Sequence, residues 1–172
     1  MPIISKLFEL IMLQILNPFL TNCSSQFGFK KGFGCSHAVY AVRKTVDYFT
    51  SLESTVNLCS IDISKAFDKV NHFKLFHKLM ERNVPLNCIL LLSCWFDKST
   101  ICVRWGSSFS YFVTLETGVR QGSILSHKLF ALFVDDELLV RLRRSGLGCH
   151  INGMCFNAVM YADDLMLLSI SI

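Results

Sequence analysis

The chain has 172 residues, of which 52% are hydrophobic and only 17% are charged, and its formal net charge at pH 7 is +4. This length fits one domain and is sufficient to bury a hydrophobic core. The charged fraction is below the roughly 25% typical of soluble domains, which favours either a membrane protein or a piece of a larger protein with exposed interfaces. The mild positive charge permits a polyanionic partner without requiring one.

A membrane-spanning helix needs about 18 or more nearly uncharged apolar residues in a row. The most apolar stretch, residues 3–20, is interrupted by Lys6 and Glu9, and no small-residue cleavage pattern of a secretory signal follows it. The eight cysteines form no CxxC pair and have no histidine at zinc-finger spacing, so we interpret them as reduced thiols. We therefore predict an intracellular protein, either nuclear or cytoplasmic, without a membrane span.

The first third of the chain predicts two helices separated by a loop. Residues 3–16 are apolar nearly all round and predict a helix that Pro18 ends. Residues 17–35 are rich in Asn, Ser, Gly and Lys and predict a loop. Ser36 is a candidate N-cap for a helix over 36–51, where apolar residues step by three and four.

A strand and two helices are expected next. Residues 55–63 are rich in β-branched and apolar residues and predict a strand. Helices are predicted over 72–82 and 86–96, and Pro85 suits the start of the second.

Residues 101–115 predict a β-hairpin that turns at Gly106-Ser107-Ser108. A long helix is expected over 126–144, with Gly146 placed to end it in the left-handed conformation. The three arginines in its last turn complement the helix dipole, and we put this role ahead of RNA contact.

The end of the chain predicts three short strands, over 149–152, 154–161 and 165–170. Asn152-Gly153, between the first two, is a strong hairpin signal. Ala162-Asp163-Asp164, between the second two, is not a usual tight-turn sequence. Two adjacent acids between apolar strands therefore call for a chemical explanation.

Asp62 also lies in an apolar strand-like run. If its strand neighbours the Asp163-Asp164 hairpin, three carboxylates converge, and buried carboxylates repel one another unless a cation lies between them. Oxygen-only ligands favour Mg²⁺ or Mn²⁺ over zinc, and two such ions can support phosphoryl transfer. The alternative is that Asp163-Asp164 is only a turn and that Asp62 is only a helix cap.

Four segments in order carry a resemblance to a known family: Gln26–Gly32, Ser60–His72, Gly118–Ser126 and Tyr161–Asp164. The last is the YADD form of the YxDD signature of reverse transcriptases. The other three resemble the fingers motif, the first palm motif and the glycine-containing substrate motif of that family. The chain resembles the reverse transcriptase domain of a non-LTR, LINE-like retrotransposon, truncated after the YADD motif.

The resemblance implies an RNA-directed DNA polymerase that transfers deoxynucleotides to the 3′-hydroxyl of a DNA primer on an RNA template. Asp62 and Asp163 would ligate both of two Mg²⁺ or Mn²⁺ ions, and Asp164 would complete the acidic cluster.

It also implies the residues that bind the incoming nucleotide. Phe67 would be the bulky side chain that excludes a 2′-hydroxyl, and Gln121 would contact the nucleotide. Gly122 would let the backbone approach it closely. Lys30 stands where the family usually has Arg and can offer positive charge to the triphosphate. Lys65 is a weaker candidate because it also suits a solvated turn.

The expected fold is α+β: a right-hand polymerase palm whose antiparallel sheet is backed by helices, with partial fingers and the thumb missing. Residues 1–35 and 73–117 would form the fingers, and residues 36–72 and 118–172 the palm. Thumb and endonuclease segments would normally belong to the same polypeptide. The alternatives are a catalytically inactive mobile-element remnant that binds nucleic acid or a partner protein and, with less support, a metal-binding regulatory module.

Overall fold

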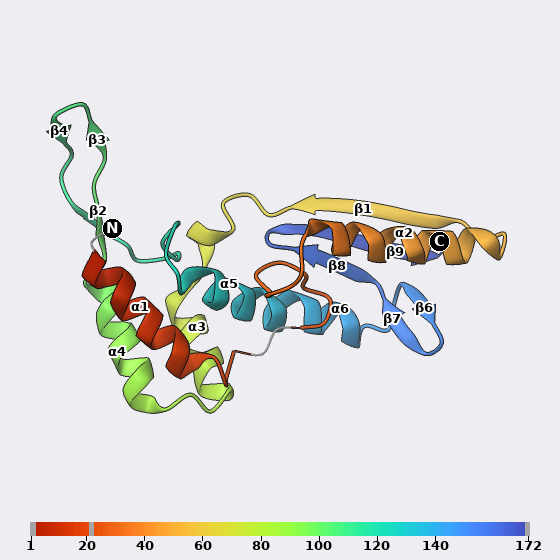
Figure 1. Ribbon diagram of the computed structural model, residues 1–172, viewed down its shortest axis with the longest axis horizontal. Helices are drawn as coiled ribbons and strands as arrows, with labels where there is room; N and C mark the ends of the chain where they lie inside the picture. Colours follow the sequence, from red (N-terminus) through yellow and green to blue (C-terminus); the bar gives the residue numbers. More distant parts are fainter. Residues whose placement is uncertain (1–2, 21–22, 171–172) are drawn as a thin grey trace. The chain divides into compact units, whose positions relative to one another are not determined.

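The computed structural model describes residues 3–20 and 23–170 (Figure 1). The chain divides into two compact units. Unit 1 comprises Met1–Leu20 and Phe67–Leu129, and unit 2 comprises Thr21–Ala66 and Phe130–Ile172. The last boundary falls inside helix α5 (Ser126–Val134).

Helices α1 (Ile3–Leu16), α3 (His72–Glu81) and α4 (Leu86–Asp97) belong to unit 1. All three confirm the predicted helices to within one residue. Helix α1 packs on α4 through the rings of Phe8 and Trp95, whose centroids are 4.4 Å apart.

The buried side of α1 carries Met12 and Leu16, while Ile3 and Ile4 are more than 80% exposed. Although α1 is apolar nearly all round, only one of its sides is buried. The apolar residues of its other side are exposed, as expected if the low charged fraction comes from exposed interfaces.

Local hydrogen bonds start the other two helices of unit 1. The Oδ1 of Asn71 accepts a hydrogen bond from the Lys74 amide at 2.9 Å and caps α3. Pro85 is the N-cap of α4 rather than its first helical residue, and its carbonyl accepts from the Cys88 amide at 2.9 Å.

The predicted hairpin of unit 1 consists of two short ladders. Strands β3 (Arg104–Trp105) and β4 (Ser108–Phe109) pair at its tip, and β2 (Thr100–Ile101) and β5 (Val113–Thr114) pair at its base. Figure 1 shows this hairpin extending away from α1 and α4, and Trp105 remains 86% exposed.

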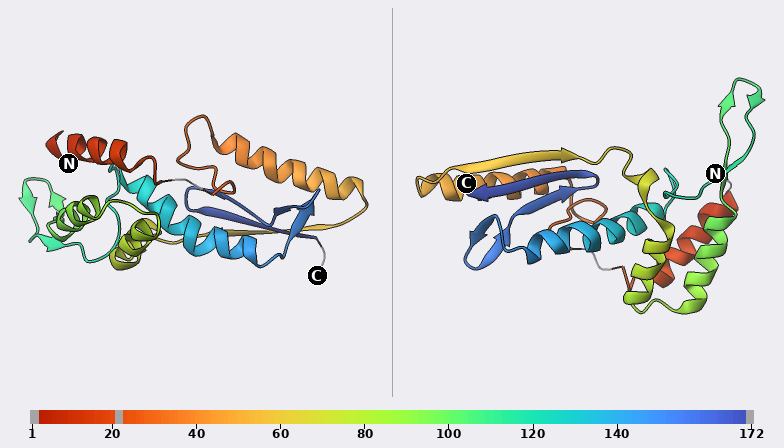
Figure 2. Two further views of the ribbon diagram at one scale, coloured as in Figure 1. Left: turned by 90° about the horizontal axis from the view of Figure 1, so that it is seen from below. Right: turned by 180° about the vertical axis from the view of Figure 1, so that it is seen from behind.

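Unit 2 is built on an antiparallel sheet with the strand order β1-β9-β8. These strands are β1 (Val56–Asp62), β8 (Ala158–Tyr161) and β9 (Asp164–Ile170). Helix α2 (Cys35–Ser51) lies along one face of the sheet, as the views in Figure 2 agree.

The core on that face contains five buried residues. Ala38 and Phe49 come from α2, Val159 and Leu168 come from the sheet, and Cys149 comes from a neighbouring hairpin. Neighbouring residues of a strand point to opposite faces, so Met160 points away from α2. Because Met160 is completely buried, β8 is covered on both faces.

Two local predictions in unit 2 are wrong. Helix α2 begins at Cys35 with Gly34 as its N-cap, so Ser36 is not the cap. The single strand predicted over 154–161 is two strands, β7 (Met154–Phe156) and β8, which belong to different sheets. Asn157 separates them because its side chain is buried and donates to the Leu142 carbonyl at 2.6 Å.

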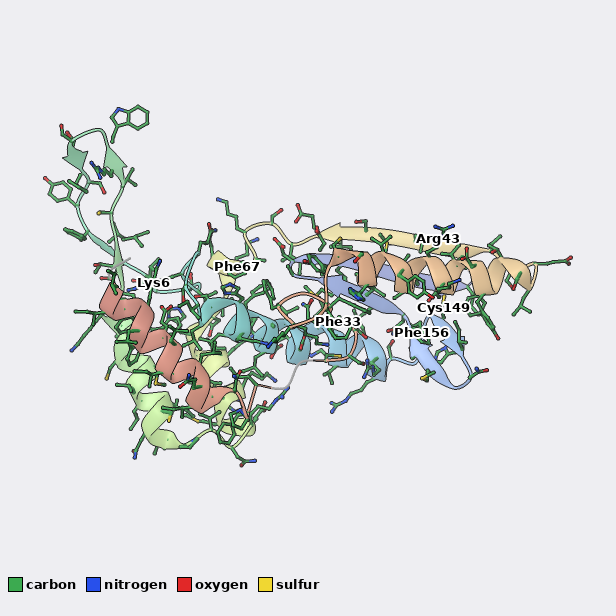
Figure 3. The ribbon with its side chains drawn as sticks, viewed as in Figure 1. Lys6, Phe33, Arg43, Phe67, Cys149 and Phe156 are labelled. Atoms are coloured by element: carbon green, nitrogen blue, oxygen red, sulfur yellow. The ribbon has the colours of Figure 1, made fainter. Side chains whose placement is uncertain are left out.

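Strand β6 (Cys149–Ile151) pairs with β7 around Asn152-Gly153, whose φ angles of +50° and +78° give the expected tight turn. Figure 3 labels Cys149 and Phe156, which face each other across this hairpin. Burial, with a smaller effect of neighbouring Cys155, raises the pKa of the Cys149 thiol, which therefore stays neutral. All eight cysteines of the chain are free.

The long helix predicted over 126–144 is continuous but not uniform. It consists of α5, a π-helical segment (Asp135–Leu139) and α6 (Val140–Arg144), and Gly146 follows with a φ of +68°. Within the described part of the chain, no helix is long and apolar enough to cross a membrane.

Candidate active site

Unit 2 brings the three predicted metal-binding aspartates to one end of its sheet. Asp62 is the last residue of β1 and Asp164 is the first of β9, and the two are paired directly opposite each other. Directly opposed residues of antiparallel strands project from the same face with Cβ atoms about 4.5–5.5 Å apart. Asp163 is next to this pair, in the turn that joins β8 to β9.

That turn has two central residues, because Tyr161 pairs with Asp164 and only Ala162 and Asp163 lie between them. Ala162 has a φ of +59°, while Asp163 is not in the positive-φ region. This pattern matches a type II′ turn, which normally has Gly at its first central position. An alanine held in such a sparsely populated backbone conformation carries a strain of about 1–3 kcal/mol.

Another segment of unit 2 runs along the outer edge of β8. The Met160 amide donates to the Ser25 carbonyl at 2.9 Å, and the Phe27 amide donates to the Met160 carbonyl at 2.8 Å. Gln26 and Met160 thereby form a parallel β-bridge. The fingers-like motif of the sequence is therefore in contact with the strand that precedes Asp163.

The surroundings of the aspartates differ from the buried setting expected from the sequence. Asp62 and Asp164 are exposed, and Asp163 is half-buried. The three aspartates lie at the end of the sheet, and in β1 every residue after Val56 is exposed. The premise of buried carboxylates is therefore wrong, although the expected pairing of the two strands is confirmed.

None of the three aspartate side chains has a hydrogen bond or ion pair to a residue that the structure describes. Among residues 3–20 and 23–170, no three acidic, histidine or cysteine side chains are close enough to hold a metal ion together. Asp62 and Asp164 nevertheless form an oxygen-only donor pair without a cationic partner there. Such a pair fits a hard divalent cation.

The two predicted lysines of unit 2 have different surroundings. The Lys30 Nζ donates to the Cys23 carbonyl at 2.6 Å and lies 6.0 Å from the centre of the Phe33 ring. Lys30 therefore has a local role in holding its own loop. Lys65 is exposed in the turn after β1, with a φ of +55°.

The other predicted nucleotide contacts belong to unit 1. Phe67, labelled in Figure 3, begins the short helical turn η1 (Phe67–Lys69). Its carbonyl accepts from the Val119 amide at 2.8 Å, two residues before Gln121. The structure thus joins the segment of Phe67 to the segment of Gln121 and Gly122, and both of these last residues are exposed.

Gly118 fixes this junction in unit 1. Its amide donates to the Val70 carbonyl at 2.8 Å, and its carbonyl lies 2.7 Å from the Nε2 of His72. Its φ is +89°, and a Cβ there would lie 2.8 Å from the Cα of Asp68. Only glycine fits both the backbone conformation and the close approach.

Sequence reasoning gave no role to Glu9, which is buried in α1. Its Oε2 accepts from the Ile124 amide at 2.9 Å and so holds the segment between Gly122 and α5. The available signal was that Glu9 is the single acid of this mostly apolar helix.

Comparison with known proteins identifies the family to which the chain belongs. Residues 1–172 match the family model "Reverse transcriptase (RNA-dependent DNA polymerase)", and the chain belongs to that family.

Its curated relatives are retrotransposon proteins. The probable RNA-directed DNA polymerase from transposon BS of Drosophila melanogaster is 28% identical over 77% of this chain and 15% of its own length. The Pol polyprotein from the type-1 retrotransposable element R2 of Popillia japonica is 30% identical over 66% of this chain and 16% of its own length. The RNA-directed DNA polymerase from mobile element jockey of Drosophila funebris is 28% identical over 98% and 18%. The chain thus spans less than a fifth of each of these relatives.

A solved structure supports the fold independently. Apo telomerase from Candida tropicalis, truncated from its C-terminal domain, has a TM-score of 0.58 and 11% identity, and the match covers 96% of this chain and 33% of that one. This likeness confirms the predicted α+β class with an antiparallel sheet and packed helices.

Proposed function

We propose that this chain forms the catalytic centre of an RNA-directed DNA polymerase, which adds deoxynucleotides to the 3′-hydroxyl of a DNA primer on an RNA template. The observation that carries the proposal is the pairing of Asp62 with Asp164 at the YADD turn, in a chain that matches the reverse transcriptase family throughout.

Asp62, Asp163 and Asp164 would hold two Mg²⁺ or Mn²⁺ ions. Such ions, when bound, activate the attacking hydroxyl and stabilise the leaving oxygen of the triphosphate. The chain's own contribution is to place carboxylate oxygens on one side of the reacting phosphate. Because Asp62 and Asp164 have no protein cation beside them among the described residues, their repulsion favours uptake of a divalent ion.

The residues of unit 1 would select the nucleotide. The ring of Phe67 would leave no room for a 2′-hydroxyl, and Gln121 would contact the incoming nucleotide. Gly122, with a φ of +76°, would allow close backbone approach. Lys65 and Lys30 would add positive charge near the triphosphate. The assignment of residues 1–35 and 73–117 to fingers, and of the remainder to the palm, belongs to the same proposal.

Primer extension on an RNA template with Mg²⁺ tests this function. We expect extension by the unchanged chain and a loss of about a hundredfold or more in Asp163→Asn, since removal of a metal ligand forfeits several kcal/mol of transition-state stabilisation. Asp47→Asn is the matched control, because Asp47 is an exposed acid of unit 2 on helix α2. Equal extension by the chain and by Asp163→Asn would refute the assignment.

A second candidate is binding of nucleic acid without catalysis. Among the described residues, no three acidic, histidine or cysteine side chains are close enough to hold a metal ion together, and this favours it. Cleavage of the chain by Fe²⁺ and peroxide separates the two candidates, because Fe²⁺ bound at a Mg²⁺ site cuts the nearby backbone. Cleavage close to Asp62 and Asp163 that is lost in Asp163→Asn supports a metal site. Primer–template binding without such cleavage and without extension would favour the second candidate.

A further inference from the structure

Gln26 is a polar side chain with no exposed surface, in the segment that runs along β8. Strand β8 is an edge of its three-stranded sheet. The backbone of residues 25–27 pairs with this edge only at Met160. Beyond Met160 the edge continues into the turn at Ala162, and among residues 3–20 and 23–170 no further backbone group pairs with it there.

The side chain of Gln26 takes the place of that missing partner. Its Nε2 donates to the Ala162 carbonyl at 3.2 Å, and its Oε1 accepts from the Ala162 amide at 3.2 Å. The same Oε1 also accepts from the Gly28 amide at 2.8 Å. Because two amide donors face one terminal atom, that atom must be the oxygen, which fixes the orientation of the side-chain amide.

Both polar backbone groups of Ala162 are therefore bonded to one side chain. A β-strand would satisfy them in the same way, by one acceptor and one donor. This matters because Ala162 has a positive φ, which alanine does not favour. The two hydrogen bonds offset the strain only while Ala162 keeps this conformation.

We propose that Gln26 is a positioning residue for the acidic turn, and that it acts by clamping Ala162 so that Asp163 and Asp164 keep fixed directions. The link to catalysis rests on the function proposed above. The clamp itself is a property of the folded chain and can be tested without turnover.

Gly28 supports the same clamp from the other side. A Cβ at Gly28 would lie 3.0 Å from the Cα of Ala162 and 3.0 Å from the Oε1 of Gln26, and closer still to the Ala162 nitrogen. The Gln26-x-Gly28 spacing thus supplies an amide side chain and the space that this side chain needs.

Hydrogen exchange of the metal-free chain tests the clamp directly. Gln26→Met keeps the length of the side chain and removes its three hydrogen bonds. We expect exchange of the Ala162 amide, followed by NMR, to become about tenfold faster, as the loss of one hydrogen bond implies.

Asn157→Leu is the matched control. Asn157 is also a buried amide side chain of unit 2, and it bonds to the Leu142 carbonyl, away from the turn. This variant should leave the exchange rate of Ala162 unchanged relative to its neighbours in β8. Equal acceleration of Ala162 in both variants would mean general loosening of unit 2, and unchanged exchange in Gln26→Met would overturn the clamp.

Kinetics connect the clamp to catalysis. In primer extension, Gln26→Met should lower kcat by about ten- to a hundredfold, because misplaced carboxylates lose transition-state contacts, and should change the KM for deoxynucleotide little. Adding Ala162→Gly should restore part of kcat, since glycine adopts the positive φ without strain. An unchanged kcat in Gln26→Met, or equal changes in kcat and KM without this rescue, would overturn the positioning role.

The two proposals fail in different ways. If Asp163→Asn extends primers as well as the unchanged chain, the proposed function is wrong, while the exchange result for Ala162 still decides whether the clamp exists. If Asp163→Asn is inactive but Gln26→Met has normal exchange and normal kcat, the function stands and the clamp is wrong.

Discussion

The close approach between Gly28 and Ala162 leaves no space for a side chain. Gly28 does not have a positive φ, so its backbone conformation alone would allow alanine. The constraint comes from the neighbouring turn, whose backbone atoms meet the position of a Cβ. Backbone atoms cannot move aside as the end of a flexible side chain can, so the segment or the turn must shift.

Gly28→Ala should therefore lower the free energy of unfolding of unit 2 by about 1–3 kcal/mol, the usual range for overpacking. Denaturant unfolding followed by circular dichroism measures the change. Gly34→Ala is the control, because Gly34 has an ordinary φ of −128° and the nearest atom to its added Cβ is 3.8 Å away. Its cost, from the weaker N-cap, should be below about 1 kcal/mol. Equal losses in both variants would contradict the steric account.

The aspartates could be predicted from the sequence as a group because their strands are short, apolar and interrupted by charge. Their exposure could not, since β1 is exposed after Val56 although its sequence is mostly apolar. Gln26 was visible only as the first letter of a motif. Its partner Ala162 is distant in sequence, and no periodicity indicates a bond between a side chain and a distant backbone group.

The helix from Ser126 to Arg144 contains a buried acid at its π-helical segment. Asp135 is 1% exposed, and its Oδ2 accepts from the Cys23 amide at 2.6 Å. This bond ties the segment before Gln26 to the helix. A π-helical turn changes which residues face inward, and here the carboxylate of Asp135 reaches the core side of the helix.

Asp135→Ala should destabilise unit 2 by about 1–3 kcal/mol, because the Cys23 amide loses its acceptor. Glu137→Ala, in the same turn, removes a partly exposed acid that pairs with Arg141 at 3.3 Å. Such surface pairs contribute about 0–1 kcal/mol. Thermal unfolding of both variants checks the difference, and similar losses in the two would show that the Cys23–Asp135 bond adds no particular stability.

Helices and turns with strong local signals were predicted well. Helix α3 follows apolar spacing and ends within one residue of the expected position. The break at Asn157 was missed because an isolated polar residue in an apolar run also occurs in continuous strands. The π-helical segment was missed because the pattern over residues 135–139 differs little from that of an α-helix.

The division into two units depends on contacts that no local pattern reveals. Helix α1 belongs with Phe67–Leu129, while residues 23–34, which precede α2, belong with the sheet. The apolar surface of α1 predicts that the helix is buried, but it does not show which element covers it. The ring pair of Phe8 and Trp95 joins residues that are far apart in the chain.

If the two units are separate cooperative units, a cavity in one should loosen that one first. Leu92 is fully buried in α4 of unit 1, and Leu168 is 2% exposed in β9 of unit 2. Leu92→Ala should cost about 2–5 kcal/mol and should speed hydrogen exchange in α1, α3 and α4, while β1, β8 and β9 keep their protection. Leu168→Ala should give the reverse pattern. Hydrogen exchange followed by mass spectrometry distinguishes these regions, and equal loss of protection in both units from either variant would show that the chain unfolds as a single unit.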